Sequence, residues 1–438
     1  MSGNTVTSET TKQTLKKYPI ALAVFFGLVF ACMFTIAFGV RTDDVHPDEL
    51  QSRPAVLYYR DHLLPPDVRE LDDSYFSGYG MTRLWELNPY YVLAGKASLM
   101  SGDYASFRIF GLLLAFAIMV LCLRMHPKNR VFAFVFALTP QVWYLFSYAT
   151  SDAFDFFLGV VCLYQLVKED SFLNRVFDGK DVKPRAYPLL GLLFALVLMG
   201  KKNYYLTALW VFCVLILKLF QKTKEERKGA FIRCLCLLGV TLAIFGARYL
   251  YDQSMYDFHR SEVVSEQMEL RAEARYKESA APETYAEGFH LNRQGVPFTE
   301  FLTSYGFFDL LSKSFAGLYG AYNVGTNDLY YIVYYLILLM IWILWGIEVF
   351  RKKTQRSYFM IAIALTAFSF ALVVYNAYFV DFQPQGRYLF PAIPVLCYGL
   401  CTQKDLGEKR TFRICTYLLA GLSLASFALI AVPRLGGF

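Results

Sequence analysis

Long apolar runs, separated by shorter polar segments, make up most of the chain. The first run, residues 18–40, contains no charged residue and is long enough to cross a bilayer as a helix, which takes about 20 residues. Ten further runs follow, several of them short, at residues 106–124, 131–148, 152–167, 187–200, 203–219, 231–250, 328–350, 358–379, 387–402 and 412–432. We therefore predict an all-α polytopic membrane protein with about eleven transmembrane helices.

Basic residues cluster in every second gap between these runs, beginning with the gap after residue 124. Because loops rich in Lys and Arg stay on the cytoplasmic side, the pattern predicts a multi-pass protein of the cell membrane with a cytoplasmic N-terminus. The other gaps then face outward. The predicted organisation is a tail at 1–17, a core of about seven helices at 18–250 with a first outer loop at 41–105, a large outer loop at 251–327, and C-terminal helices at 328–438.

The two long outer loops are where functional residues are expected, since long connections inside a compact protein are uncommon unless they carry function. In the first loop, residues 54–64 have apolar and charged positions at roughly helical spacing and end before two prolines. This predicts a short helix that lies on the membrane surface. In the second loop, residues 260–277 predict a charged helix, and residues 301–320 predict an apolar segment that touches the bilayer or covers a cavity.

Composition agrees with a membrane protein and limits its function. Of the 438 residues, 56% are hydrophobic and 18% are charged, and the net charge of +7 is explained by the basic cytoplasmic gaps, so we expect no nucleic-acid partner. The nine cysteines lie in or beside apolar runs, as small buried side chains do. The sequence has no phosphate-binding loop or dinucleotide fingerprint, and no cytoplasmic gap is long enough for a nucleotide-binding domain. An ATP-driven pump or an enzyme with a cytoplasmic nucleotide donor is therefore disfavoured.

Four carboxylates directly follow the first apolar run, at the outer membrane surface: Asp43, Asp44, Asp48 and Glu49. A structural interpretation is that Pro47 opens a helix and that the two acids after it favour the positive end of the helix dipole. A functional interpretation is that Asp48 accepts a proton from an acceptor hydroxyl. Glu49 or Asp44 would then position it or help to hold a divalent cation such as Mg²⁺, Mn²⁺ or Ca²⁺. The two interpretations are compatible, because a helix start also fixes a carboxylate rigidly.

Basic residues also occur on the side where the topology predicts few of them. Lys201 and Lys202 fall in a tight outer hairpin, Arg248 lies at the outer end of an apolar run, and Arg387 is placed similarly. Such cations suit the phosphate of a lipid, and the planar fork of arginine matches phosphate oxygens. Taken singly, each side chain is also explained by extension toward the lipid headgroups. Four of them at one face favour a phosphate site.

Further candidates for lining a cavity or contacting an acceptor are His46, Asp152, Tyr204 and Tyr388. Asp152 stands at the start of an apolar run, where it either caps a helix or faces the same cavity as Asp48. The histidines show no metal-ligand spacing such as His-x-x-x-His, which makes a dedicated zinc site unexpected.

On these residues the chain resembles the GT-C superfamily, the integral-membrane glycosyltransferases that use polyprenyl-phosphate sugars. Members share a first outer loop with an acidic catalytic motif and surface helices, matched here by Asp43-Asp44-Val-His-Pro-Asp48-Glu49 and by residues 54–64. They also share a later outer loop that helps to cover the site, matched by residues 251–327. The acidic pair is similar to that of the mannosyltransferase branch, and its Pro-Asp-Glu setting is similar to bacterial members of uncertain substrate.

The resemblance implies transfer of a sugar from a polyprenyl-phosphate donor to an extracytoplasmic glycan, lipid or protein acceptor, with inversion at the anomeric carbon. Asp48 would deprotonate or orient the acceptor hydroxyl, and Lys201, Lys202 or Arg387 would balance the charge of the departing lipid phosphate. The alternative is a carrier or flippase for a lipid-linked sugar, which would also need a cavity and outer cations. An accessory subunit of a cell-envelope assembly is a third interpretation.

Overall fold

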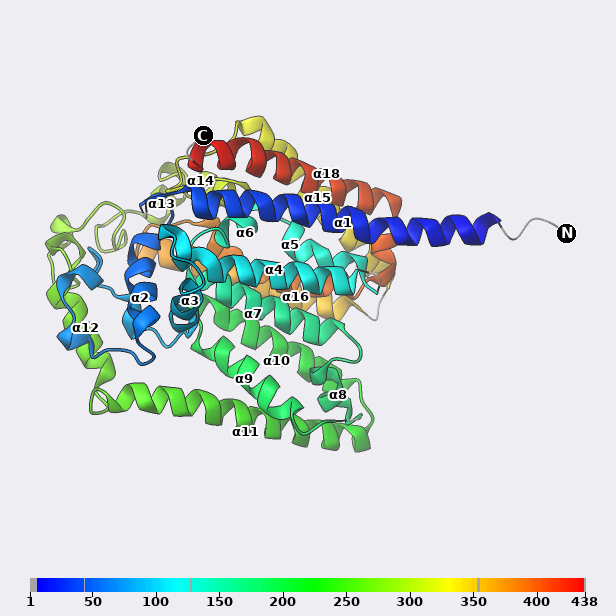
Figure 1. Cartoon of the computed structure of the whole chain (residues 1–438), viewed down its shortest axis with the longest axis horizontal. Coiled ribbons are helices and arrows are strands. Elements are labelled where there is room, and N and C mark those ends of the chain that lie inside the picture. The colour runs from blue at the N-terminus through cyan, green and yellow to red at the C-terminus, as the bar shows by residue number, and fades with distance from the viewer. Residues whose placement is uncertain (1–5, 43, 127, 181, 353–354, 437–438) are drawn as a thin grey trace.

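The computed structural model describes residues 6–42, 44–126, 128–180, 182–352 and 355–436, so Asp43 lies outside the described residues. Every regular element in the described part is helical, and the long helices run side by side along one axis (Figure 1). Many large apolar side chains on the outer helices are exposed, as on the face of α11, Lys224–Ser254, where only 17% of the most apolar window is buried. Such surfaces are stable in lipid and not in water. The prediction of an all-α polytopic membrane protein is confirmed.

Seven stretches of helix in the described residues are long and apolar enough to cross a membrane. They are formed by α1, Val6–Gly39; α4, Ile109–Met125; α10, Tyr205–Phe220; α11; α15, Asp328–Arg351; α16, Arg356–Phe379; and α18, Arg410–Ser426, which continues to α19, Val432–Leu435. The predicted count of eleven is not confirmed. Shorter helices fill the bundle between them: α7, Ser151–Val167; α8, Phe172–Asp178; α9, Ala186–Met199; and α17, Ala392–Cys401.

The predicted single helix over residues 131–148 is wrong. The segment breaks into α5, Phe134–Ala137, and α6, Pro140–Leu145. Pro140 has no N–H to donate to the preceding turn, and the hydroxyl of Thr139 instead accepts the N–H of Gln141 to start the new helix. The carbonyl freed at Leu138 accepts a hydrogen bond from the Tyr334 hydroxyl at 2.8 Å. An irregular backbone is tolerated here because protein surrounds the segment.

The two long loops gather at one end of the bundle, which we call the loop end (Figure 1). It contains α2, Glu49–Asp61; α3, Tyr90–Ser98; α12, Arg260–Arg271; α13, Phe298–Ser304; and α14, Phe307–Ala316. Short helices were predicted in both loops and are present, although α2 begins five residues before the predicted start at residue 54 and α12 ends six residues before the predicted end at residue 277.

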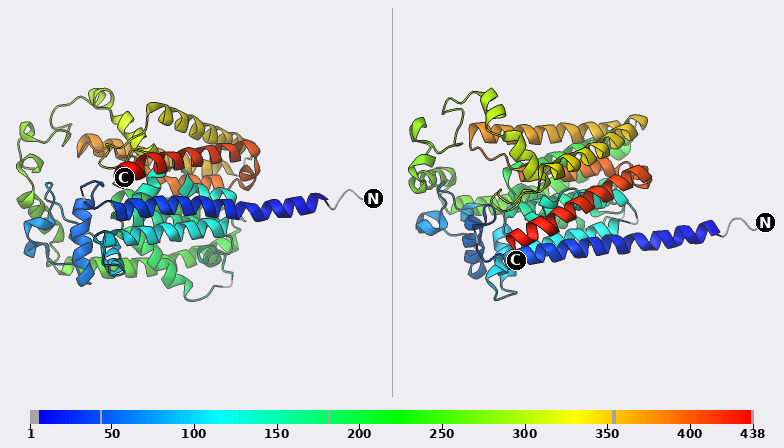
Figure 2. Two further views of the ribbon diagram at one scale, coloured as in Figure 1. Left: turned by 45° about the horizontal axis from the view of Figure 1, so that its top comes forward. Right: turned by 90° about the horizontal axis from the view of Figure 1, so that it is seen from above.

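The two loops also pack against each other, as the views in Figures 1 and 2 show. The N–H of Glu273 donates to the carbonyl of Gly78 at 2.9 Å, and Arg271 forms an ion pair with Asp73. Arg260 donates to the carbonyl of Trp85. These contacts join segments about 200 residues apart in the chain, so the loop end is one packed unit on the bundle.

Candidate functional site

Asp48 stands in a left-handed backbone conformation directly before α2, with φ of 60°. This conformation costs a residue other than glycine about 1 kcal/mol or more and is enriched at functional positions. Asp48 is the residue before the first turn, so the expectation that Pro47 opens the helix is wrong. Its carboxylate makes no capping hydrogen bond to α2. The side chain is therefore directed to other partners.

Those partners are cations from distant parts of the chain. Arg387 Nη2 lies 2.7 Å from Asp48 Oδ2, and Arg83 Nη2 lies 3.7 Å from Asp48 Oδ1. The Asp48 side chain is 23% exposed, so it remains reachable. Burial disfavours its charged form, but the charges of Arg387, Arg83 and Lys201 outweigh burial and hold the pKa of Asp48 below its usual range. The carboxylate is ionised at neutral pH.

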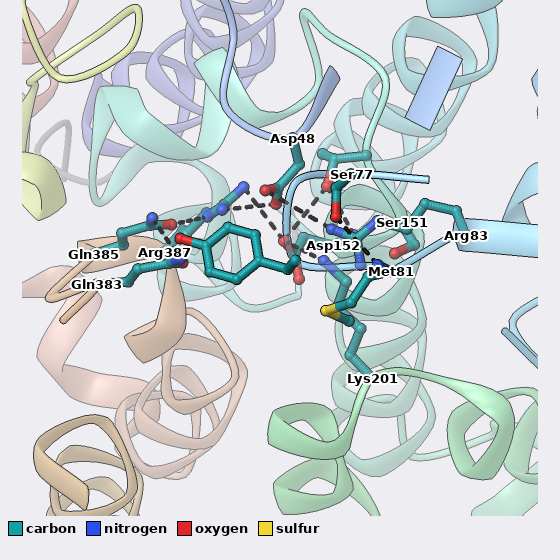
Figure 3. A network of polar contacts seen from close by, with 12 residues as sticks. Asp48, Ser77, Met81, Arg83, Ser151, Asp152, Lys201, Gln383, Gln385 and Arg387 are labelled. Atoms are coloured by element: carbon teal, nitrogen blue, oxygen red, sulfur yellow. Dashed lines mark hydrogen bonds and ion pairs between the residues drawn. The ribbon is translucent and has the colours of Figure 1, made fainter. Parts of the chain in front are cut away.

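A second carboxylate, that of Asp152, links Arg387 to Lys201. Lys201 Nζ lies 2.9 Å from Asp152 Oδ2, and Arg387 Nη1 lies 3.7 Å from the same oxygen. Figure 3 shows these side chains and that of Arg83 pointing toward one another from four regions of the chain. We call these five residues the Asp48 cluster: Asp48, Arg83, Asp152, Lys201 and Arg387.

Local structure explains why Asp152 faces the cluster. Thr150 is the residue that caps α7, and its hydroxyl accepts the N–H of Asp152, so Asp152 itself is not the cap. The next acid on the helix, Asp155, accepts the backbone N–H of Lys201 at 3.0 Å. Gly200 permits this approach, because a Cβ at that position would lie 2.6 Å from an Asp155 oxygen. The two acids of α7 thus hold Lys201 by its side chain and by its backbone.

The turn before α17 positions Arg387. The predicted span at 387–402 begins too early, because Arg387 lies in the 3₁₀ turn Gly386–Leu389 and the helix starts at Ala392. A Cβ on Gly386 would lie 2.2 Å from the backbone nitrogen of Phe315 in α14, so only glycine fits there. Gln385 accepts a hydrogen bond from Arg387 Nε at 2.6 Å. The packing of Gly386 therefore fixes the turn, and the hydrogen bond to Gln385 fixes the guanidinium.

Arg387 also lines a narrow pocket with Pro47, Tyr148 and Tyr322. The cavity has a volume of about 10 Å³, which is room for about one water molecule. Within the described residues, the Nη1 atom of Arg387 has no hydrogen-bond partner although it is buried. Buried donors are usually paired, so an unused guanidinium donor at a pocket is consistent with a site for a ligand oxygen.

His46 directly precedes Pro47 in the chain and is buried. Its Nδ1 atom is 2.6 Å from the hydroxyl of Tyr144, and its ring stacks on Tyr148 with centroids 5.2 Å apart. Burial, together with the charge of Arg108, lowers the pKa of His46 well below its usual value. The imidazole is therefore neutral and supports the aromatic wall of the pocket. Tyr388 is close as well, with its ring 5.5 Å from the Arg387 guanidinium carbon.

Glu49 has a different environment from its neighbour Asp48. It is fully buried and forms an ion pair with Arg108, with Glu49 Oε2 2.5 Å from Arg108 Nη2. Glu49 Oε1 also accepts the N–H of Ala149 at 2.8 Å. Arg108 in turn donates to carbonyls at the end of α1, including that of Val40 at 2.7 Å. This pair joins α2 to α1 and α4, which is a structural arrangement.

Other predicted site residues do not join the cluster. Asp44 and Lys202 are exposed, and Asp44 forms no ion pair in the part of the chain that the structure describes. Arg248 is paired with Asp252 of its own helix at 3.0 Å. Tyr204 is buried near Asp152 and Asp155, and its hydroxyl has no hydrogen-bond partner among the described residues.

The residues do not fit a divalent cation held by Asp48 and Glu49. The oxygens of Glu49 are occupied by Arg108 and Ala149, and those of Asp48 face two arginines. No group of three His, Cys, Asp or Glu side chains suited to a metal ion occurs within the described ranges.

Two charged residues were missed from the sequence: Arg83 of the Asp48 cluster and Arg108 of the structural pair with Glu49. Arg83 contacts Asp48 and also Glu86, with Nη1 2.8 Å from the Glu86 Oε1 atom. Arg108 lies at the loop end of an apolar run, as Arg248 does. The same signal that selected Arg248, an arginine on the side with few basic residues, would have found Arg108. No pattern in the sequence distinguishes Arg83 from the other charged residues of its loop.

Comparison with known proteins gives a family and no function. Residues 100–396 match the family described as predicted membrane protein (DUF2142). The matched range includes Asp152, Lys201 and Arg387 and begins after Asp48. No curated protein and no solved structure matches the chain. Because the match covers well over half of the 438 residues, the chain belongs to this DUF2142 family of membrane proteins.

Proposed function

We propose that the protein is a membrane glycosyltransferase that moves a sugar from a polyprenyl-phosphate donor to an acceptor outside the cytoplasm. The observation that carries the proposal is the Asp48 cluster itself. It holds an accessible, ionised carboxylate beside a buried arginine with an unused donor, at the loop end of a membrane bundle. An inverting transfer needs these two groups, one for the acceptor hydroxyl and one for the leaving phosphate.

In the proposed reaction, the oxygen of the acceptor hydroxyl attacks the anomeric carbon, and the bond from that carbon to the phosphate oxygen breaks. The hydroxyl proton passes to Asp48, and the polyprenyl phosphate leaves with the bonding electron pair. Arg387 and Lys201 stabilise the charge that develops on the phosphate. Solvent then takes the proton from Asp48, whose side chain is partly exposed.

Arg387 also connects donor binding with the basicity of Asp48. In the structure its guanidinium binds Asp48 at 2.7 Å and keeps the pKa of that carboxyl low, which makes Asp48 a weak base. A donor phosphate would compete with Asp48 for the same guanidinium. The carboxylate would become a stronger base when the donor is bound, so that an acceptor is activated only in the complete complex.

The pocket is too narrow for a sugar as it stands, with a cavity volume of about 10 Å³ against about 300–1,000 Å³ for typical small-molecule sites. The large loop contributes Ser314, Leu318 and Tyr322 to the wall, and we expect donor binding to displace Tyr322. The basic gaps predict that the loop end faces away from the cytoplasm. The acceptor would then be a glycan, lipid or protein of the cell envelope.

The test is a transfer assay on the purified full-length protein with a panel of radiolabelled polyprenyl-phosphate sugars and an envelope extract as acceptor. We expect at least one donor to be consumed by the wild type and not by Asp48→Asn. Asp61→Asn, which makes the same change at the exposed end of α2, is the matched control and should act as the wild type does. Binding of a lipid-linked sugar without any transfer would instead support a carrier.

A further inference from the structure

A second cavity lies at the end of the bundle opposite the Asp48 cluster. Figure 2 shows that α1 and α18 spread apart toward this end, whereas they meet at the loop end, where a Cβ on Gly39 would be 2.9 Å from the carbonyl of Gly436. The space between them is bounded by the segment that follows α4. Its volume is about 250 Å³, many times that of the pocket at Arg387. We call it the α1–α18 groove.

The walls of the groove are mostly apolar. Leu22 and Phe25 of α1 face it from one side, and Phe134 of α5 from another. Ala420 and Gly421 of α18 complete it with small side chains. Among the described residues, nothing lies within 4 Å of the position that a Cβ on Gly421 would take, so the groove is open at that point. A wall of this kind matches the hydrocarbon chain of a lipid.

One end of the groove is polar and basic. Arg130 and Arg413 both line it, together with His126. Burial, together with the charge of Arg130, lowers the pKa of His126, so the imidazole is neutral and the two guanidinium groups supply the positive charge. Arg130 Nη1 also binds the exposed carboxylate of Glu408 at 3.0 Å. Arg130 and Arg413 thus present two cationic side chains to this end of the groove.

The adjoining segments are also rich in basic residues, two of which, Lys404 and Lys409, form ion pairs with Glu169 and Glu348. The segments 124–130 and 404–413 contain seven basic residues, which are Arg124, Lys128, Arg130, Lys404, Lys409, Arg410 and Arg413, against two acidic ones, Asp405 and Glu408. Basic pockets between membrane helices, at the end where such clusters lie, are suited to anionic headgroups. An apolar groove that ends at two arginines is complementary to a phospholipid, with the acyl chain against the apolar wall and the negative headgroup beside the arginines.

We propose that the α1–α18 groove binds one anionic phospholipid from the membrane leaflet at this end of the bundle. Its phosphate lies beside Arg130 and Arg413, and an acyl chain follows the apolar wall past Phe25, Phe134 and Gly421. A zwitterionic lipid would fill the wall equally well but would not match the positive end. The site is independent of the proposed sugar transfer, because it lies across the bundle from the Asp48 cluster.

Binding is tested with the full-length protein in detergent, supplemented with dioleoylphosphatidylglycerol or with dioleoylphosphatidylcholine, by native mass spectrometry. We expect one phosphatidylglycerol molecule to remain bound at energies that remove phosphatidylcholine. Arg413→Gln removes one cation and should weaken retention about fivefold, the effect of one basic residue near an anionic lipid surface. Arg410→Gln, an exposed cation of the same segment that does not line the groove, should not.

A second pair of variants tests the apolar wall. Gly421→Leu places a side chain in the open part of the groove, where the Cβ atom meets no described residue within 4 Å, and should abolish the selective retention. Gly346→Leu is the matched control, because that glycine also has no described residue within 4 Å of its Cβ position but lies on α15 and does not line the groove. Equal retention of the two lipids by the wild type, or wild-type retention in Gly421→Leu and Arg413→Gln, would overturn the proposal.

Discussion

Asp48 and Glu49 are adjacent carboxylates, each paired with an arginine, and they are held in opposite ways. Glu49 and Arg108 have side chains that are fully buried, and several backbone groups complete their hydrogen bonds. Asp48 is 23% exposed, stands in a left-handed conformation, and faces an arginine that retains an unused donor. One pair is closed to ligands and the other is open to them.

The difference shows how a structural ion pair is told apart from a candidate site. A buried pair with its hydrogen bonds complete has no capacity left for another molecule, and breaking it harms the fold. A pair with backbone strain, partial exposure and an unsatisfied donor stores free energy that a ligand can recover. Sequence alone gives the two acids the same description, since they stand side by side in one loop.

The largest effect that we predict is on stability, at the closed pair. Arg108→Gln leaves the Glu49 charge buried without its partner, which should destabilise the fold by about 3–5 kcal/mol. The measurement is the unfolding midpoint of purified protein in detergent. Arg41→Gln is the control, because it breaks the exposed pair with Asp103, for which the expected cost is below about 1 kcal/mol. Equal stability of the two variants would remove the distinction between the closed and open pairs.

The next effect is at the open pair, in Arg387→Lys. This variant keeps the positive charge but loses the planar fork that binds two oxygens together. Losing one charge-assisted hydrogen bond should weaken donor transfer between about tenfold and about a hundredfold. The unfolding midpoint should change less than in Arg108→Gln. A variant that transfers as fast as the wild type would show that Arg387 does not hold the donor phosphate.

A smaller effect is expected at the cap of α7. Thr150→Ala removes the hydroxyl that accepts the N–H of Asp152, at a cost of about 1 kcal/mol, while Thr150→Ser keeps it. The loosened first turn carries Asp152, so transfer should also decline modestly in the alanine variant. Unfolding midpoints and initial rates for the pair of variants check this. A serine variant as impaired as alanine would show that the methyl group, not the hydroxyl, matters.

The smallest effect concerns pH. The neighbouring cations keep the pKa of Asp48 below its usual range, and burial keeps His46 neutral. A carboxyl with a lowered pKa loses its charge only as the pH falls through that lowered value. At limiting donor, where the pH dependence of the rate reports the free protein, transfer should therefore show no acid limb at or above about pH 4, the ordinary value for an aspartate, and none near pH 6.5 from His46. An acid limb near neutral pH would assign the proton transfer to another group.

Much of the fold followed from apolar periodicity, because a bilayer requires uninterrupted helical runs such as 18–40. The failures occurred where tertiary contacts override that rule. The break at Thr139 and Pro140 is stabilised because the hydroxyl of Tyr334, on α15, donates a hydrogen bond to the carbonyl of Leu138. No local sequence pattern reveals this contact. Arg387 was predicted to begin a helix and instead lies in a 3₁₀ turn, because the close approach of α14 to Gly386 depends on the packed structure.

The candidate site was predictable to a similar degree. Asp48, Asp152, Lys201 and Arg387 were each identified as unusual charges at one face, and the structure brings them together. The roles of Glu49 and Arg248 were not predictable, because each is decided by a partner that the sequence does not point to.

The central claim is that Asp48 performs chemistry while its neighbours hold the donor, and Asp48→Asn tests it most directly. We predict that the purified variant binds polyprenyl phosphate at least as tightly as the wild type, because a negative charge that competes for Arg387 is removed. Its unfolding midpoint should stay close to that of the wild type, and sugar transfer should fall about 10²–10⁴-fold, the usual contribution of a general base. Transfer that survives at the wild-type rate, or loss of polyprenyl-phosphate binding, would contradict the assignment.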